Sequence, residues 1–312
     1  MSLPALAEVR EQYVPADVHP AIKALSACLK EKIGDALCSV LFYGSCLRGG
    51  DPFDGLVDLY VIVDSYRTAY RRVVPSIFNW LLPPNVYYLE AALGDEKVRA
   101  KYAVVSRDDF KRGTSNRWFH SYLWARFAQP VGIVYFRDQK CREEIFLSLG
   151  QSVTTFIERT LPVIPIAFDD ALLWREGLMR TYRAELRVEK KERTAGLIEA
   201  DRPYYEAVTR IAMEAVRYPV STTEKGYTSR IGWADRQLQR VFWGTRSIQG
   251  KFLSLMRLVK AAFTFDGGLD YIVWKLERHS GQRIEVPDYV RRAPLLFAWG
   301  MFWRLYRKGV FR

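Results

Sequence analysis

A glycine–serine pair, followed by a strand that carries an aspartate, is the clearest chemical pattern in this sequence. Residues 36–43 form a short apolar run that ends at Gly44 and Ser45, and Asp58 lies near the start of a second apolar run over residues 56–64. A glycine lets the backbone approach a phosphate closely, a serine hydroxyl can donate to phosphate oxygens, and a strand-borne carboxylate can hold Mg²⁺. The pattern indicates transfer chemistry on a nucleoside triphosphate, although a plain turn and a solvated aspartate at a strand end would use the same residues.

A metal site of this kind normally uses two carboxylates, and the second is missing from its usual position. Ligands at positions i and i+2 of a strand lie on one face, but here Asp58 is followed at i+2 by Tyr60. Asp64 lies on that face about 20 Å farther along, at ~3.3 Å per residue, so one ion cannot easily take both. We expect Glu90 to be the first candidate for the missing ligand, which makes Asp58, Asp64 and Glu90 the predicted metal ligands. The loop before the second strand supplies two further candidates, Asp54 and Asp51.

The elements that would position these residues are short apolar runs and amphipathic segments. Apolar or β-branched runs predict strands at residues 36–43, 56–64, 86–93, 101–106 and 131–136. Apolar residues at helical spacing predict helices at residues 17–35, 66–80, 108–127, 142–161, 172–200 and 204–216. The layout is an α/β (α+β) one that resembles the nucleotidyltransferase fold of polymerase β-like enzymes. A polar, turn-prone stretch follows at residues 218–230, and the GxxxxGK[ST], GxGxxG and GxSxG motifs do not occur.

The positive charge of the chain is concentrated at its C-terminal end. The 312 residues carry 47 Lys and Arg against 35 Asp and Glu, a net charge of +12. Residues 226–312 hold 16 of the basic residues and 6 of the acidic ones, whereas residues 1–225 are almost neutral. The excess indicates a polyanionic partner, and its position beside aromatic residues favours an anionic membrane surface over nucleic acid. The four cysteines and three histidines form no zinc-binding spacing.

From about residue 40 to 280, most of its length, the chain resembles the mitochondrial phosphatidate cytidylyltransferases, also called the translocator assembly and maintenance family. The similar segments keep the family's order along the chain, and the main ones are 42–45, 56–64, 85–88, 101–106, 125–131, 177–183, 257–264 and 271–276. The sequence departs from the family's pattern in a shorter loop between Ser45 and Asp58 and in Ala103, where the family has glycine. The resemblance implies a polymerase β-like nucleotidyltransferase domain, a helical winged-helix-like domain and a basic amphipathic C-terminal region. The three predicted parts are residues 1–140, 141–225 and 226–312.

The resemblance also implies a reaction and roles for individual residues. CTP and phosphatidic acid would give CDP-diacylglycerol and pyrophosphate, with Mg²⁺ as cofactor, for phospholipid (phosphatidylglycerol and cardiolipin) biosynthesis. Asp58 would hold the metal and Lys101 the outer phosphates, as the catalytic residues. The nucleotide-binding residues would be Tyr43, Gly44, Ser45, Lys101, Arg126 and Arg183. Arg257, Lys260 and Lys275 would contact the phosphatidate headgroup, although a solvated basic helix face explains them equally well.

The last part of the chain combines six basic residues with large aromatic ones. Residues 289–312 hold no acid, and the eleven uncharged residues 293–303 separate two basic groups. A helix of that length covers about 16 Å, roughly half a hydrocarbon core, so it cannot span a bilayer but can lie in its interface. We expect an interfacial helix at about residues 293–308, although a helix docked on the core would explain the same pattern. Its predicted membrane contacts are Phe297, Trp299, Phe302, Trp303, Arg304 and Arg307.

Three functions stay open on the sequence. The first is the lipid cytidylyltransferase, and the second keeps the fold but transfers the nucleotide to a nucleic-acid end or a small-molecule hydroxyl. The third is a catalytically inactive membrane-tethered scaffold, which Tyr60 in place of a second acid favours. Since the first residues hold no signal-like apolar stretch and no Arg-rich presequence, we expect a bacterial cytoplasmic protein at the inner face of the cell membrane. A eukaryotic member would lie at the mitochondrial inner membrane, and no nucleic-acid partner is expected.

Overall fold

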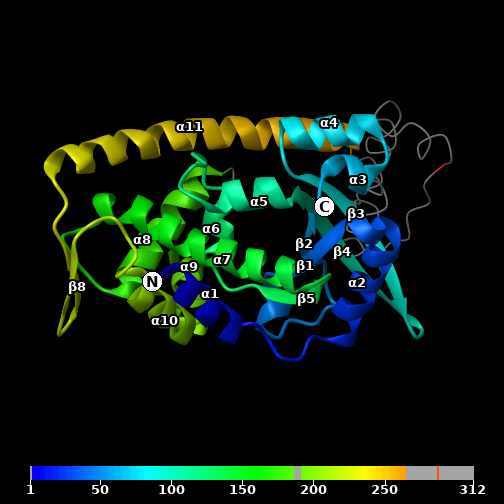
Figure 1. The fold of residues 1–312 in the computed structure, drawn as a ribbon, viewed down its shortest axis with the longest axis horizontal. Helices are drawn as coiled ribbons and strands as arrows, with labels where there is room; N and C mark the ends of the chain where they lie inside the picture. The colour runs from blue at the N-terminus through cyan, green and yellow to red at the C-terminus, as the bar shows by residue number, and fades with distance from the viewer. Residues whose placement is uncertain (1, 186–190, 265–286, 288–312) are drawn as a thin grey trace, which may run out of the picture.

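A five-stranded mixed sheet forms the centre of the larger part of the molecule (Figure 1). The computed structural model describes residues 2–185, 191–264 and 287. The strands of the sheet lie in the order β3-β4-β2-β1-β5. Their bounds are β1 (Leu37–Tyr43), β2 (Val57–Val63), β3 (Asn85–Leu93), β4 (Glu96–Ser106) and β5 (Gly132–Phe136). The sheet and the helices that cover it confirm the predicted α/β class.

Strand β2 lies at the middle of this sheet. It pairs with β1 in antiparallel fashion and with β4 in parallel fashion, while β5 and β3 form the two edges. Val57, Leu59 and Val61 are buried on one face of the sheet, and Tyr60 and Ile62 on the other. A strand buried on both faces has a nearly continuous apolar sequence, which is why the sequence predicted it well.

Helices cover both faces of the sheet. On one face lies α2 (Pro20–Ile33), and on the other lie α5 (Arg107–Thr114), α6 (Trp124–Phe127) and α7 (Gln139–Thr160). Helix α2 begins where the His19 side chain accepts a hydrogen bond from the Ala21 N–H, and it ends at Gly34 with a φ of 67°. These caps agree with the usual preferences for proline in the first turn and glycine after the last.

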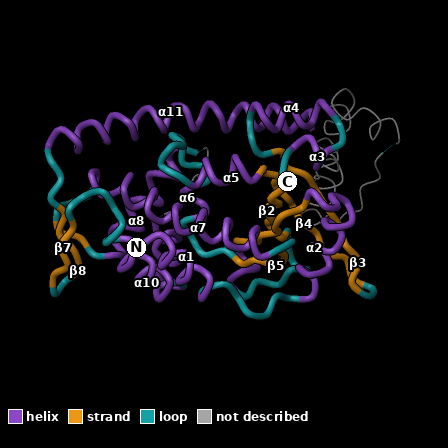
Figure 2. The backbone as a smooth tube through the Cα atoms, viewed as in Figure 1, coloured by secondary structure: helices purple, strands orange, loops and turns teal. Residues whose placement is uncertain are grey.

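The second part of the molecule consists of helices and a small sheet (Figure 2). Its elements are β6 (Ala167–Phe168), α8 (Asp170–Ala184), α9 (Lys191–Ala200), α10 (Arg202–Ala212), β7 (Val220–Thr223) and β8 (Gly226–Ser229). The three short strands pair in the order β6-β8-β7. The β7–β8 hairpin follows the helices and pairs with β6 through β8, and the predicted winged-helix-like domain stays a prediction. The stretch 218–230 is therefore a hairpin and not only a turn, and Gly226, with a φ of 131°, lets its second strand approach the Phe168 carbonyl of β6, where a Cβ would lie 2.5 Å from the oxygen.

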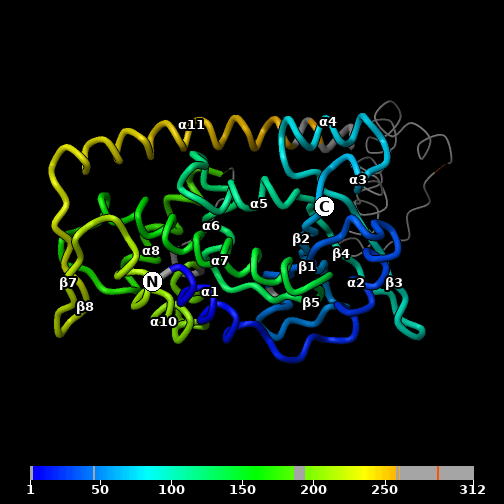
Figure 3. Tube along the Cα trace, in the orientation of Figure 1, coloured from blue at the N-terminus to red at the C-terminus, as the bar shows by residue number. Residues whose placement is uncertain are grey.

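Two further helices connect these parts. Helix α11 (Trp233–Thr264) runs along one long edge of the molecule and contacts both α8 and β3 (Figure 1). Helix α1 (Ser2–Gln12), which the sequence did not predict, packs against α7 and α10 far later in the chain (Figure 3). The domain boundaries at residues 140 and 225 stay predictions. No helix in the described ranges is both long and apolar enough to cross a membrane.

Three predicted helices are each divided in the structure. The predicted helix 66–80 is α3 (Tyr66–Tyr70) and α4 (Val73–Leu81), because Arg71 between them adopts a φ of 52°. The predicted helix 108–127 is α5 and α6, and the predicted helix 172–200 is α8 and α9. Three short 3-10 turns also occur: η1 (Gly34–Ala36), η2 (Ser45–Arg48) and η3 (Leu161–Val163).

Candidate active site

Three predicted site residues lie next to one another because of the strand register. Tyr43 at the end of β1 is opposite Asp58 near the start of β2, and Asp58 is opposite Lys101 of β4. Residues paired in this way project from the same face of a sheet. The Lys101 Nζ lies 3.2 Å from the Asp58 Oδ1, so the two side chains form an ion pair, and both are partly exposed.

The turn after β1 continues this group. Gly44 has a φ of 88°, a conformation that favours glycine, and a side chain built there would lie 3.6 Å from the Asp58 Oδ2. The backbone therefore turns directly beside the Asp58 carboxylate and enters η2. Ser45 is the first residue of η2, but its side chain lies outside the described part of the structure, so its predicted phosphate contact stays a prediction.

A cavity of about 700 Å³ opens where these strand ends meet the second part of the molecule. Five residues predicted to form the site line it: Tyr43, Gly44, Asp58, Lys101 and Arg126. Six further residues complete the wall: Arg48, Gly50, Gln129, Pro130, Tyr182 and Leu197. The cavity thus has walls from the sheet, from the α6 region, and from α8 and α9.

Arg126 of α6 is the cation most firmly held in this wall. Its Nη1 donates to the hydroxyls of Tyr43 at 2.9 Å and Tyr60 at 3.3 Å, and its Nη2 lies 3.7 Å from the Glu185 carboxylate. The guanidinium also lies 4.9 Å from the centre of the Tyr122 ring. Burial raises the pKa of Tyr60, so its hydroxyl stays neutral. The position that usually holds a second metal-binding acid therefore holds a neutral hydroxyl that orients an arginine.

The donor set fits a magnesium ion only together with a substrate. Within the described ranges, no three His, Cys, Asp or Glu side chains are grouped closely enough to hold a metal. Among the residues that line the cavity, Asp58 is the one with a carboxylate side chain. Mg²⁺ in nucleotide sites is commonly held by one or two carboxylates, substrate phosphates and waters. Asp58 therefore fits as the protein ligand of a nucleotide-bound ion.

Asp64 does not join Asp58 at this site. It lies at the opposite end of β2, where the Arg107 Nη1 donates to it at 3.0 Å and Arg137 makes a second ion pair. Hydrogen bonds from Arg137 lower the pKa of Asp64, and Arg107 adds to this effect while partial burial opposes it. Asp64, one of the predicted metal ligands, therefore lies away from Asp58 and is held by two arginines.

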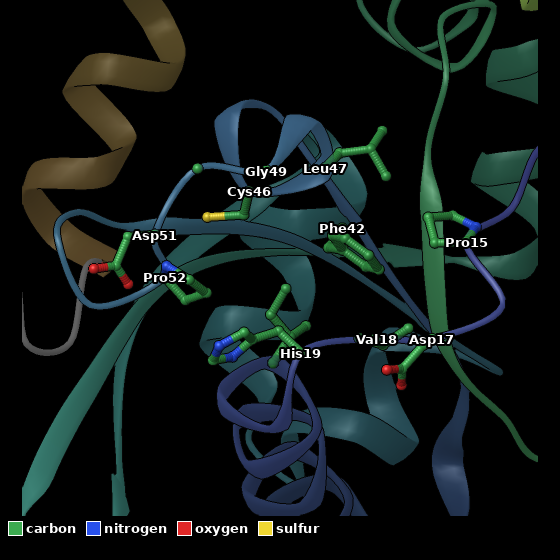
Figure 4. A pocket seen from close by; sticks show the side chains of 12 residues that line it. Pro15, Asp17, Val18, His19, Phe42, Cys46, Leu47, Gly49, Asp51 and Pro52 are labelled. Atoms are coloured by element: carbon green, nitrogen blue, oxygen red, sulfur yellow. The ribbon is translucent and has the colours of Figure 1, made fainter.

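Glu90 is likewise held by other partners. It lies on β3, where Arg99 is 3.2 Å and Lys97 3.8 Å from its carboxylate, and the Tyr88 hydroxyl donates to it at 2.7 Å. Of the two loop candidates, Asp51 lines a different cavity of about 410 Å³ beside the start of α2 (Figure 4). Its carboxylate accepts the Phe53 N–H at 2.9 Å, which closes a local turn. Neither Asp51 nor Asp54 is among the residues that line the 700 Å³ cavity.

The remaining predicted contacts lie away from the cavity or outside the described residues. Arg183 of α8 is exposed and does not line the cavity, whereas its neighbour Tyr182 does. On α11, Arg257 donates to the Pro83 carbonyl at 3.0 Å, and the buried Lys260 donates to the Pro84 carbonyl at 2.7 Å. Burial lowers the pKa of Lys260 to about 7, and Arg257 adds to this effect. Lys260 thus fastens α11 to the backbone instead of presenting a headgroup-binding cation.

Seven predicted lipid or membrane contacts cannot be placed. Lys275, Phe297, Trp299, Phe302, Trp303, Arg304 and Arg307 lie outside the described residues. The cavity also contains residues that the sequence did not suggest, above all Arg48, whose Nε lies 2.7 Å from Asp201. The sequence position of Arg48, four residues after Gly44, could have suggested it as a site residue, since a cation in that turn lies close to any phosphate held there.

Known proteins give a distant structural likeness. No protein-family model matches the chain, and no curated protein sequence matches it. The fold is similar to the crystal structure of a nucleotidyltransferase-like protein from Exiguobacterium sibiricum, with a TM-score of 0.29 and 9% identity, over 72% of this chain and 89% of that one. A likeness of this degree says nothing about function, so the proposals below rest on this chain's own residues.

Proposed function

We propose that this protein is a nucleotidyltransferase that binds a nucleoside triphosphate in the 700 Å³ cavity beside Asp58. The observation that carries the proposal is the grouping of one carboxylate, Asp58, with the cations Lys101 and Arg126 next to the Gly44 turn. A triphosphate carries several negative charges, and transfer of its nucleotidyl group requires alignment and charge neutralisation. No residue needs to act as a covalent nucleophile when the acceptor is already an anion.

Each residue of the group has a distinct task in this proposal. Lys101 is partly exposed and pairs with Asp58, and such a pair contributes little to stability, so the lysine can turn toward phosphate oxygens at small cost. Arg126 is fixed by tyrosine hydroxyls and by Glu185, so its planar guanidinium keeps a constant orientation beside the cavity. Mg²⁺, when bound with the nucleotide, would be held by Asp58 and would neutralise charge on the departing pyrophosphate.

For the substrates we propose CTP as donor and phosphatidic acid as acceptor, with CDP-diacylglycerol and pyrophosphate as products. This assignment is supported by the resemblance of the chain to phosphatidate cytidylyltransferases, which includes the segments that supply Tyr43, Gly44, Lys101 and Arg126. A phosphatidate phosphate would attack the α-phosphorus of CTP directly. The proposed role is CDP-diacylglycerol supply for phospholipid synthesis, with the enzyme at the inner face of the cell membrane.

A transfer assay tests the proposal. The full chain is incubated with α-labelled CTP, Mg²⁺ and phosphatidic acid in mixed micelles, with ATP, GTP and UTP in parallel. We expect labelled CDP-diacylglycerol from CTP, its loss in Asp58→Asn, and its retention in the matched control Asp95→Asn, which changes an exposed carboxylate in the β3–β4 turn. Transfer of the label to a nucleic-acid end or a small hydroxyl, with no lipid product, would contradict the lipid assignment.

Tyr60 favours a second function, that of a catalytically inactive scaffold with a nucleotidyltransferase fold. Its hydroxyl occupies the place of a second acid and accepts a hydrogen bond from Arg126. CTP that binds by calorimetry but stays intact with every acceptor would support this function. CTP that neither binds nor reacts would contradict both functions.

A further inference from the structure

Helix α4 is exposed on its apolar side and buried on its polar side. The residue of this helix that is buried is Asn79, whose Nδ2 donates to the Val104 carbonyl at 3.0 Å. The large apolar residues of α4 are exposed instead, with Trp80 70% exposed: Val73, Val74, Ile77, Phe78, Trp80 and Leu81. A surface helix of a globular protein normally has the opposite arrangement. The outward side of α4 is thus an apolar surface that the rest of the described chain leaves uncovered.

Helix α11 presents a second surface of this kind. Its buried side packs on the protein through residues such as Trp243 and Arg246. Its large exposed apolar residues are Trp233, Leu238, Val241, Ile248, Phe252, Leu255 and Met256. From Leu238 to Leu255 they recur at intervals of three, four or seven, and Met256 lies four residues after Phe252, so they form one stripe opposite the buried side. The exposed side of this long helix is therefore apolar, whereas its buried side includes the polar residues Gln239, Arg246 and Lys260 beside Trp243.

Polar contacts connect α11 to the segment that follows α4. Arg257 and Lys260 of α11 donate to the carbonyls of Pro83 and Pro84, which follow α4 directly. In Figure 1 both helices lie at the same long edge of the molecule, and the hydrogen bonds to Pro83 and Pro84 connect α11 to the chain that follows α4. We call the exposed apolar residues of the two helices the α4–α11 face. Groups of large exposed apolar side chains on a protein surface mark an interaction site.

The charges around the α4–α11 face are mostly positive, with the exposed Asp235 in the first turn of α11 as an acid among them. Arg67, Arg71 and Arg72 are exposed immediately before α4, and α4 itself contains no charged residue. Along α11, Arg240 and Lys251 are exposed beside the apolar stripe, and residues 236–264 contain no acid. An apolar helix face with aromatic residues and a basic border is the pattern of a surface that lies in the interface of an anionic bilayer.

We propose that the α4–α11 face docks on the headgroup region of an anionic lipid bilayer. The exposed side chains project from helices along an outer edge and do not line the cavities described above, which suits a flat lipid surface better than a peptide in a groove. This proposal rests on the proposed function, because an enzyme that uses a lipid acceptor must reach the bilayer that contains it. It adds a membrane contact made by residues 73–81 and 233–256, which differs from the predicted interfacial helix at 293–308.

The docked face is linked to the cavity through aromatic contacts. The Arg257 guanidinium lies 4.1 Å from the centre of the Tyr122 ring, and Arg126 contacts the same ring at 4.9 Å. Arg126 lines the proposed nucleotide cavity. Arg257 and Tyr122 therefore connect α11 to the cation that the proposed function places against the nucleotide.

Vesicle co-sedimentation of the full chain, without nucleotide, tests the proposal. The vesicles are an equal mixture of phosphatidylcholine and phosphatidylglycerol, with pure phosphatidylcholine for comparison. Two double variants each place charges in the face: Ile248→Glu with Phe252→Glu, and Val74→Glu with Trp80→Glu. The matched control is Ile166→Glu, which changes a residue 61% exposed elsewhere on the surface. All substituted side chains are exposed, so the folded state is retained and is verified by circular dichroism.

We expect wild type and the control to bind the mixed vesicles and each double variant to bind at least roughly tenfold more weakly. Binding of both double variants at the wild-type level would overturn the proposal and leave the attachment to other residues, such as 293–308. Absence of wild-type binding would also overturn it. A wild-type dimer in light scattering that both variants dissociate, with unchanged vesicle binding, would assign the face to a second copy of the chain. The variants are also assayed for transfer to a water-soluble short-chain phosphatidic acid. Variants that lose vesicle binding but keep this transfer have lost membrane docking and not the proposed function.

Discussion

Strand β2 has an aspartate at each end, on the same face of the sheet, and the two carboxylates have different surroundings. Asp58 faces one lysine and a cavity of about 700 Å³. Asp64 accepts hydrogen bonds from Arg107 and Arg137, and Arg107 also pairs with Glu144. Arginine stays charged and presents fixed donors, whereas lysine is a flexible point charge. The carboxylate with the single flexible partner is the one available to a ligand, and the carboxylate with two arginines closes the opposite end of the sheet.

The largest expected effect separates the two aspartates by activity. Asp58→Asn keeps the shape of the side chain but removes the charge that would hold the metal, so we expect transfer to fall on the order of 100-fold to 1,000-fold or more. Asp64→Asn should keep transfer close to wild type at a temperature where it is folded. The measurement is kcat/KM for both variants beside wild type. Equal losses in the two variants would contradict the distinction between the two ends of β2.

The next effect concerns the guanidinium beside Asp58. Arg126→Lys keeps a positive charge but loses the planar pair of donors and the contacts with both tyrosine hydroxyls, so we expect transfer to fall on the order of tenfold to 100-fold. Glu185 keeps a cationic partner in this variant, which limits the loss of stability. Kinetics at varied CTP concentration check the prediction, with Arg112→Lys as a control at an exposed helix position. Unchanged kcat and KM in Arg126→Lys would remove Arg126 from the proposed site.

The Asp58 end of β2 was largely predictable from the sequence because its residues are near one another along local patterns. A strand that ends at Gly44 and a following strand that begins near Asp58 become neighbours when the two strands pair in antiparallel fashion. Lys101, at the start of another apolar run, joined them through the parallel pairing of β4 with β2. Each step required only strand assignment and register.

The Asp64 end and the α11 contacts were not predictable in the same way. Arg107 and Arg137 lie 43 and 73 residues after Asp64, and no local pattern associates them with it. The burial of Lys260 depends on a contact with carbonyls 176 residues away. Charged residues at helical spacing indicate a helix surface, but the tertiary packing decides whether that surface meets solvent, lipid or backbone.

A smaller effect is expected on the stability contributed by the Asp64 cluster. Asp64→Asn leaves Arg137 and Arg107 without their shared carboxylate, and because the group is partly exposed we expect a loss of about 1–2 kcal/mol in the free energy of unfolding. Asp58→Asn, whose carboxylate pairs with one partly exposed lysine, should lose less. Urea denaturation of the two variants compares the losses. A greater loss in Asp58→Asn would show that Asp58, and not Asp64, has the structural task.

The smallest effect is the dependence of the Asp64 contribution on pH. Arg137, assisted by Arg107, holds the pKa of Asp64 below its ordinary value of 3.8, so near that value the unfolded chain binds more protons than the folded one. The stabilisation is therefore fully present above the ordinary value and is lost as the pH falls through the folded pKa. The difference in unfolding free energy between wild type and Asp64→Asn should shrink as the pH is lowered from 5 toward 2. Asp95→Asn controls for removal of a surface carboxylate, and a wild-type advantage over Asp64→Asn that stays constant across this range would mean that Asp64 acts through packing and not through its charge.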